Sequence, residues 1–117
     1  MGRGGDHRAP VTAVEEDPDS ALPASFSLAQ NFPNPLNPST IIRFALPTDG
    51  ETRLRIYNTA GQVIQSLVEG HQQAGTYMVN WDGRDASGAE VASGAYLYRL
   101  EVPATGLSET KTMTLAR

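Results

Sequence analysis

The sequence has no cysteine, only one lysine and no long hydrophobic run. The absence of cysteine excludes a disulfide framework, a thiolate metal site and a cysteine nucleophile. No apolar stretch approaches the ~20 residues that a membrane-spanning helix needs. Residues 1–10 are polar and glycine-rich and do not resemble a signal peptide, so we expect the sequence to be a piece of a longer protein.

Negative charge is concentrated in the first 25 residues, which hold two arginines and five acidic side chains. The rest of the chain is nearly neutral, so no positive field would attract a phosphate backbone, and nucleic acid is not an expected partner. Residues 1–25 show no apolar periodicity, and such a segment buries too little surface to offset its ordering entropy. We expect a disordered acidic linker over 1–25 and one folded domain over 26–117.

Short strands separated by turns dominate the folded part of the sequence. The chain has 11 glycines and 8 prolines, which favours turns over long helices. Apolar and polar residues alternate with the two-residue period of half-buried strands. The predicted strands cover 40–46, 52–57, 62–68, 76–81, 94–102 and 108–115, with a short extended segment at Val91. We therefore predict an all-β, immunoglobulin-like antiparallel β-sandwich of about seven strands.

One predicted strand departs from simple alternation. Its apolar residues Val63, Ile64, Leu67 and Val68 do not follow a two-residue period, which predicts a β-bulge. Residues 69–75 are mostly polar and are predicted to form a loop.

Large aromatic side chains are expected to fill the core. Trp81, Tyr96 and Tyr98 lie on the apolar faces of predicted strands, and large rings dominate the area that a core buries. Gly83 and Gly94 fall at turns, where glycine allows unusual backbone angles. These five residues are predicted to have structural roles.

A proline-rich stretch precedes the first predicted strand. Residues 30–38 contain three prolines, each of which fixes its own φ and extends the residue before it. We expect a rigid, extended entry into the domain, with Phe32 and Leu36 packed against it.

Several sequence motifs occur in an order that is typical of one family. They are Gln30-Asn31-Phe32-Pro33-Asn34-Pro35-Leu36-Asn37-Pro38-Ser39-Thr40, Leu54-Arg55-Ile56-Tyr57-Asn58 with Gly61, Ala74-Gly75, Trp81-Asp82-Gly83-Arg84-Asp85, Gly88 with Val91-Ala92-Ser93-Gly94-Ala95-Tyr96, and Lys111-Thr112-Met113. On these motifs, residues 30–117 resemble the Ig-like module named after the flagellar hook-capping protein. They also resemble the related type A C-terminal sorting domain of the type IX secretion system.

The resemblance implies a non-enzymatic C-terminal module of a larger secreted bacterial protein, used for sorting, secretion or surface attachment. Its expected partners are a secretion apparatus or a cell-surface protein, together with the upstream domains of the parent chain. Two alternatives remain open. One is a structural or interaction spacer, as in the hook-cap branch. The other is a carbohydrate-binding accessory domain that stacks sugars on Tyr77, Trp81, Tyr96 and Tyr98.

The sorting hypothesis points to the final segment as the element that a partner would read. Recognition would use an exposed strand edge or the terminal strand, by addition of a strand or by shape. Lys111 is the only lysine and a candidate contact, although a solvated strand residue is the simpler interpretation. The hypothesised recognition residues are Thr110, Lys111, Thr112, Met113, Thr114 and Leu115.

One glycine-rich loop offers oxygen ligands. Asp82, Asp85 and Ser87, with Glu90 nearby, have the hard oxygen donors that calcium prefers. Their spacing is not that of an EF-hand, and turn chemistry, in which Asp and Ser bond to the local backbone, is the simpler interpretation. Calcium is therefore only a weak candidate, and we expect no other cofactor, no catalytic residue and no enzymatic activity.

Overall fold

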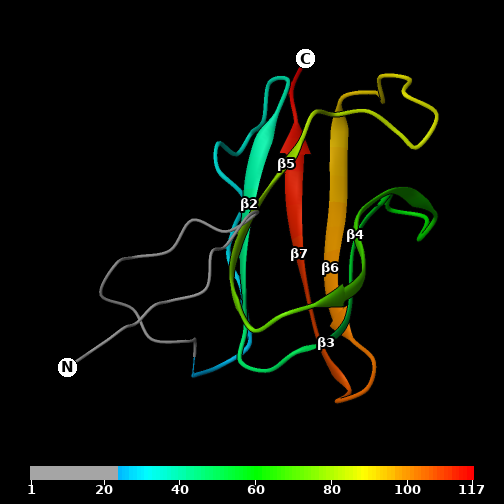
Figure 1. The fold of residues 1–117 in the computed structure, drawn as a ribbon. Coiled ribbons are helices and arrows are strands. Elements are labelled where there is room, and N and C mark those ends of the chain that lie inside the picture. The colour runs from blue at the N-terminus through cyan, green and yellow to red at the C-terminus, as the bar shows by residue number, and fades with distance from the viewer. Residues whose placement is uncertain (1–23) are drawn as a thin grey trace.

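The computed structural model describes residues 24–117, which form two antiparallel sheets. The strands are β1 (Ser27–Leu28), β2 (Thr40–Leu46), β3 (Gly50–Tyr57), β4 (Val63–Gln72), β5 (Gly75–Trp81), β6 (Gly94–Val102) and β7 (Leu107–Leu115). One sheet has the order β1-β2-β5 and the other has the order β4-β3-β6-β7 (Figure 1). The predicted all-β Ig-like sandwich of about seven strands is confirmed, whereas the predicted linker, up to residue 23, lies outside the described residues.

Alternation along the strands places one face of each sheet in a shared core. In β2, Ile42, Phe44 and Leu46 are buried, and the residues between them are not. Trp81 and Tyr98 are 1% and 0% exposed, as expected for the centre of the core. The buried apolar residues are Leu28, Leu36, Ile42, Phe44, Leu46, Leu54, Ile56, Tyr77, Trp81, Tyr96, Tyr98, Leu100, Val102, Met113 and Leu115.

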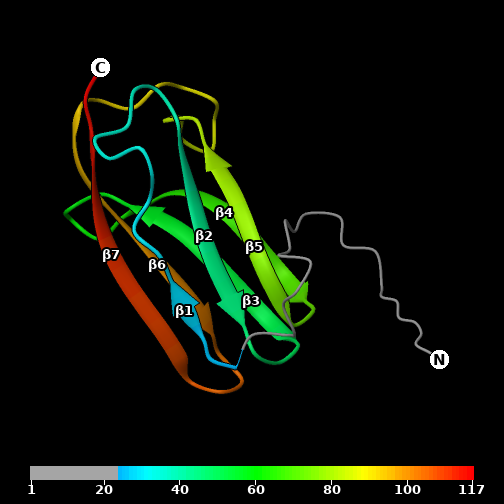
Figure 2. The same cartoon turned by 90° about the vertical axis from the view of Figure 1, so that its left-hand side faces the viewer.

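Two hairpins, β3–β4 and β6–β7, build the four-stranded sheet. The chain changes sheet between β2 and β3, between β4 and β5, and between β5 and β6, so the two sheets lie face to face (Figure 2). In the β3–β4 turn, Gly61 N–H donates to Asn58 O, and the Asn58 side chain accepts from the N–H groups of Ala60 and Gln62. These bonds close a tight hairpin connection between β3 and β4.

Strand β4 both confirms and corrects the sequence analysis. The register with β3 skips Leu67 and Ile64, so the predicted bulge is present twice, and these side chains pack against the core. The predicted polar loop over 69–75 is wrong, because β4 continues to Gln72 and β5 begins at Gly75. An edge strand has one neighbour and can therefore accept polar residues along its whole length.

Two further expectations need correction. Phe32 is 78% exposed, although its backbone exchanges both hydrogen bonds with Ile41, whereas Leu36 is fully buried as expected. Val91 lies outside the named strands, and its N–H donates to Gly83 O across a loop. The part of the chain that the structure describes contains no helix long and apolar enough to cross a membrane.

Candidate interaction site on the last strand

Strand β7 forms one edge of the four-stranded sheet and contains the hypothesised recognition residues. Met113 and Leu115 are 2% and 1% exposed and belong to the core. Thr110, Thr112 and Thr114 alternate with them, are exposed, and face away from the core. We call these three residues the threonine row. A partner can reach this row and the backbone edge of β7, but not the two buried side chains.

The proline-rich segment covers the second half of the free edge of β7. Leu36 N–H donates to Thr114 O at 2.8 Å, and Ala116 N–H donates to Leu36 O at 3.0 Å, which makes a short parallel bridge. Thr114 N–H donates to the Asn34 side-chain oxygen at 3.0 Å. The backbone of β7 beyond Met113 is therefore paired on both sides.

The first half of the same edge has no backbone pairing within residues 24–117, although β1 of the other sheet packs close beside β7. Among the described residues, Thr112 O accepts the side-chain amide of Gln30, at 2.8 Å, and no backbone donor. The β6–β7 register is unbroken, so the backbone groups of Ser108 and Thr110 point the same way as those of Thr114. Within residues 24–117, no group bonds to the backbone of Ser108 or Thr110 on this side. We call Ser108–Thr112 the open edge.

Two charged side chains lie on the inner face of the open edge. Glu109 and Lys111 are opposite Leu100 and Tyr98 of β6, so they share the face of the buried residues. Both are partly buried, and Lys111 Nζ is 3.5 Å from a Glu109 carboxylate oxygen. Inward-pointing charge at an edge strand opposes pairing with an arbitrary strand.

A buried polar network fixes the proline-rich segment. Asn31 is 2% exposed, and its backbone N–H donates to the Tyr98 hydroxyl at 2.8 Å, which in turn donates to Ala29 O at 2.7 Å. The Asn31 amide donates to the Thr40 hydroxyl, which donates to Pro33 O. Burial raises the pKa of Tyr98 to about 12. We call the proline-rich segment that lies along the second half of β7 the cover. These hydrogen bonds anchor the cover in the core.

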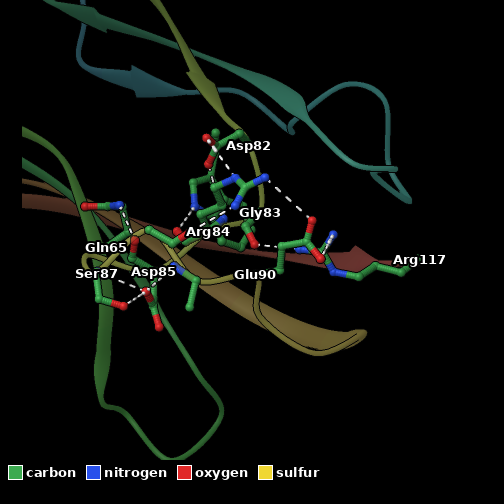
Figure 3. A network of polar contacts seen from close by, with 11 residues as sticks. Gln65, Asp82, Gly83, Arg84, Asp85, Ser87, Glu90 and Arg117 are labelled. Carbon is green, nitrogen blue, oxygen red and sulfur yellow. Dashed lines mark hydrogen bonds and ion pairs between the residues drawn. The ribbon is translucent and has the colours of Figure 1, made fainter.

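The loop between β5 and β6 holds the weak calcium candidates, and Figure 3 shows their contacts. One Asp85 oxygen accepts from the Ser87 hydroxyl at 2.7 Å and from the N–H groups of Ser87 and Ala89. The Ser87 hydroxyl and these backbone donors lower the pKa of Asp85. Asp82 instead accepts from Arg84 N–H. Both carboxylates make local turn contacts.

Within the described residues, no group of three His, Cys, Asp or Glu side chains is arranged to hold a metal ion. Calcium binding by the loop stays a prediction.

The last residue of the sequence closes this loop from the other side. Arg117 donates through Nε to Val91 O at 2.7 Å and through its terminal nitrogen to Gly83 O at 2.6 Å, and it lies 3.8 Å from Glu90 (Figure 3). Gly83 has φ 76°, and a Cβ there would lie 2.9 Å from the guanidinium and 3.0 Å from Pro38 O. Only glycine satisfies both the backbone angle and the close approach.

The proposed carbohydrate platform is not available. Tyr77, Trp81, Tyr96 and Tyr98 are 8%, 1%, 7% and 0% exposed, and Trp81 packs edge-on against Tyr96 at 5.7 Å between centroids. Rings buried in a core cannot stack on a sugar, so that alternative is wrong for these residues. Gly94 is the first residue of β6 and not a turn residue, although its φ of 149° is an angle that glycine adopts readily.

Residues 38–106 match the family described as the FlgD Ig-like domain. The chain belongs to the FlgD Ig-like domain family. The fold of this family is a structural, non-catalytic one, and the chain is a structural or interaction module of the FlgD Ig-like type.

Three solved structures resemble the domain. Dimeric latent PorU from Porphyromonas gingivalis has a TM-score of 0.62 and 23% identity over 80% of this chain and 10% of PorU. PorZ is an essential surface component of the type IX secretion system of the same organism. It has a TM-score of 0.52 and 23% identity over 79% of this chain and 11% of PorZ. FlgD from P. aeruginosa has a TM-score of 0.51 and 25% identity over 65% of this chain and 59% of FlgD.

The FlgD Ig-like domain therefore spans about a tenth of PorU and of PorZ, and the likeness to these two proteins shows the fold alone. Curated protein sequences gave no significant match.

Sequence reasoning placed the hypothesised recognition residues on β7, but it did not predict the residues that surround them. The capping roles of Gln30 and Asn34 were not predicted, because an exposed Asn before Pro is also the signature of an ordinary turn. The Arg117 contacts join residues distant in sequence, and no periodic pattern signals them. The alternation in β7 did carry the signal that separates Thr110 from Met113.

Proposed function

We propose that this domain is a non-enzymatic sorting or surface-attachment module of a larger secreted bacterial protein, and that its partner reads the threonine row. Two observations support the proposal. The threonine row is exposed on a strand whose alternate residues are committed to the core. The fold also occurs in PorZ, a surface component of a type IX secretion system.

The exposure pattern of β7 carries the choice of surface. Hydroxyls of residues two apart on a strand repeat at about 7 Å, and here the strand is paired with β6 along its whole length. The row is therefore preorganised, and binding it costs little conformational entropy. The Thr110 hydroxyl accepts from Arg99 Nε at 3.2 Å, so the row continues into the charged outer face of the sheet.

Deletion of residues 110–117 would not be a clean test of the proposal. Removing 110–117 also removes Met113 and Leu115 from the core, so loss of export could reflect loss of the fold. Substitutions in the threonine row avoid this problem, because these side chains face solvent.

The test is an upstream reporter fused to the domain and expressed in a bacterium that has a type IX secretion system. Thr110→Lys/Thr114→Lys places two cations in the threonine row. The matched control, Thr76→Lys/Asn80→Lys, places two cations on the outward-facing positions of β5, an edge strand of the other sheet. We expect the wild-type fusion and the control to be exported, and the threonine-row variant to remain in the cell with its near-ultraviolet circular dichroism unchanged.

Two outcomes would contradict the proposal. Export of the threonine-row variant at the wild-type level would exclude the row as the surface that is read. Retention of the wild-type fusion itself would exclude a sorting role, and the domain would then be a structural spacer of the general Ig-like kind.

A further inference from the structure

We propose that the open edge pairs antiparallel with the open edge of a second copy of this chain, with Thr110 of both copies on the two-fold axis. The inference goes beyond sorting, because it concerns association of the domain with itself and stands whether or not a secretion partner reads the threonine row. It rests on the backbone of Ser108–Thr112 and on the two charges between them.

The backbone permits this pairing. Ser108, Thr110 and Thr112 point their N–H and C=O groups away from β6, and the strand has no bulge. In an antiparallel pair centred on Thr110, each Thr110 faces its copy and each Ser108 faces Thr112 of the other chain, so outward groups meet outward groups. Thr112 O keeps its bond from Gln30, because a carbonyl oxygen has two lone pairs.

The charges select this register. Centring on Thr110 puts Glu109 opposite Lys111 of the partner subunit, and the symmetry repeats the pair with the roles exchanged. Centring one residue earlier would put Glu109 against Glu109, and centring one residue later would put Lys111 against Lys111. Like charges directly opposite each other are destabilising, whereas opposite charges stabilise a cross-strand pair. The inward charges that discourage arbitrary strands are thus complementary to themselves.

The cover and the opposite edge limit the assembly. Asn34 and Leu36 already occupy the edge at Thr114, so the paired stretch ends near Thr112. Such a contact buries less than the ~1,200 Å² of a standard interface, which makes the dimer weak and concentration-dependent. Strand β4 is bulged, so growth from the far edge of the sheet is disfavoured and the contact closes as a dimer.

The test is sedimentation equilibrium of the full chain over a concentration series that reaches about 1 mM. We expect a reversible dimer for the wild type. Lys111→Glu and Glu109→Lys each create two like-charge contacts and should weaken association at least about tenfold. The double swap Glu109→Lys/Lys111→Glu restores complementarity in the same register and should associate like the wild type. The control Glu51→Lys reverses an exposed charge on β3 and should have no effect.

A wild-type chain that stays monomeric throughout the series would overturn the proposal. So would single reversals that associate as well as the wild type, or a double swap that does not recover. If a single variant loses its near-ultraviolet circular dichroism, Thr110→Pro replaces it, since it removes an N–H that β6 does not use and should abolish the dimer. The reporter assay reads export and not association, so either proposal can fail alone.

Discussion

The two edge strands of the four-stranded sheet, β4 and β7, both have backbone groups with which another strand could pair, and the two edges are protected to different degrees. Strand β4 is bulged at Ile64 and Leu67, and the β5–β6 loop closes on it, with Ala86 N–H donating to Ile64 O and the Gln65 amide donating to Asp85 O. Strand β7 is regular, and among the described residues only its second half is paired along the outer edge. A bulged and covered edge cannot accept another strand, whereas a regular edge can.

The difference indicates where this domain is built for contact. Along β4, apolar side chains pack against the core without a strict period, and no residue of the strand is fully buried. Along β7, Met113 and Leu115 are buried while their neighbours are exposed, so one strand serves both the core and the surface. The same kind of substitution should therefore change the free energy of unfolding by different amounts in β4 and in β7.

The largest contrast is expected in the core contributions of the two strands. Met113→Ala removes a side chain that is 2% exposed and should lower the free energy of unfolding by about 3 kcal/mol. Leu67→Ala removes a half-buried side chain at a bulge, where the strand can relax, and should cost about 1 kcal/mol. Urea denaturation monitored by Trp81 fluorescence measures both. Equal losses would show that β4 is as much a part of the core as β7.

Two separate proline substitutions test which backbone N–H groups of β7 point toward β6. Lys111 lies between two outward residues, so its N–H donates within the β6–β7 ladder, and Lys111→Pro should cost about 3 kcal/mol. Thr110→Pro removes an N–H on the open side and should cost under about 1 kcal/mol, since edge strands accept proline there. Comparable urea midpoints for the two variants would mean that the open edge has been assigned to the wrong residues.

The cover over β7 depends on Tyr98, whose hydroxyl bonds to Asn31 and Ala29. Tyr98→Phe leaves both backbone groups without this partner and should cost about 1–2 kcal/mol. Burial holds the pKa of folded Tyr98 at about 12, above its ordinary value of 10.0, so the unfolded chain releases this proton first. The resulting stability is complete below pH 10 and is lost as the pH rises through 12.

Urea midpoints from pH 9 to 12 measure that loss, and the slope should be smaller in Tyr98→Phe. The comparison variant is Tyr77→Phe, whose hydroxyl bonds to Gln73 O, away from the cover. Burial also raises the pKa of Tyr77, so the slope should fall in this variant too, but less than in Tyr98→Phe. An unchanged slope in Tyr98→Phe would remove Tyr98 as the source of the alkaline transition.

The sequence predicts the sandwich well because period-two alternation in β2, β6 and β7 is a local signal. It predicts the end of β4 poorly, since polar residues on an edge strand and in a loop have the same composition. The misassignment of Phe32 has a similar cause. Its backbone pairs with Ile41 while the ring points to solvent, and hydrophobicity alone cannot separate backbone anchoring from burial.

The sequence suggested the strand on which the candidate site is proposed, but it did not indicate where the open and covered halves of that strand meet. Alternation separates Thr110 from Met113, whereas the line between the open and covered halves of β7 depends on contacts with Asn34 and Leu36, about 80 residues away in the chain. Such contacts follow from how the sheets close, which no window of the sequence contains.

The smallest expected effect concerns the boundary between the open and covered halves of β7. Asn34→Ala removes the acceptor of Thr114 N–H and should cost under about 1 kcal/mol, because the site is exposed. Native-state hydrogen exchange should show faster exchange at Thr114, with no change at Met113, whose N–H pairs with β6, or at Thr110, which is open already. Gln65→Ala is the counterpart on β4 and should leave the exchange of β7 unaltered. Faster exchange along all of β7 in Asn34→Ala would mean that the cover holds the whole strand in the sheet, and the two halves would then be one unit.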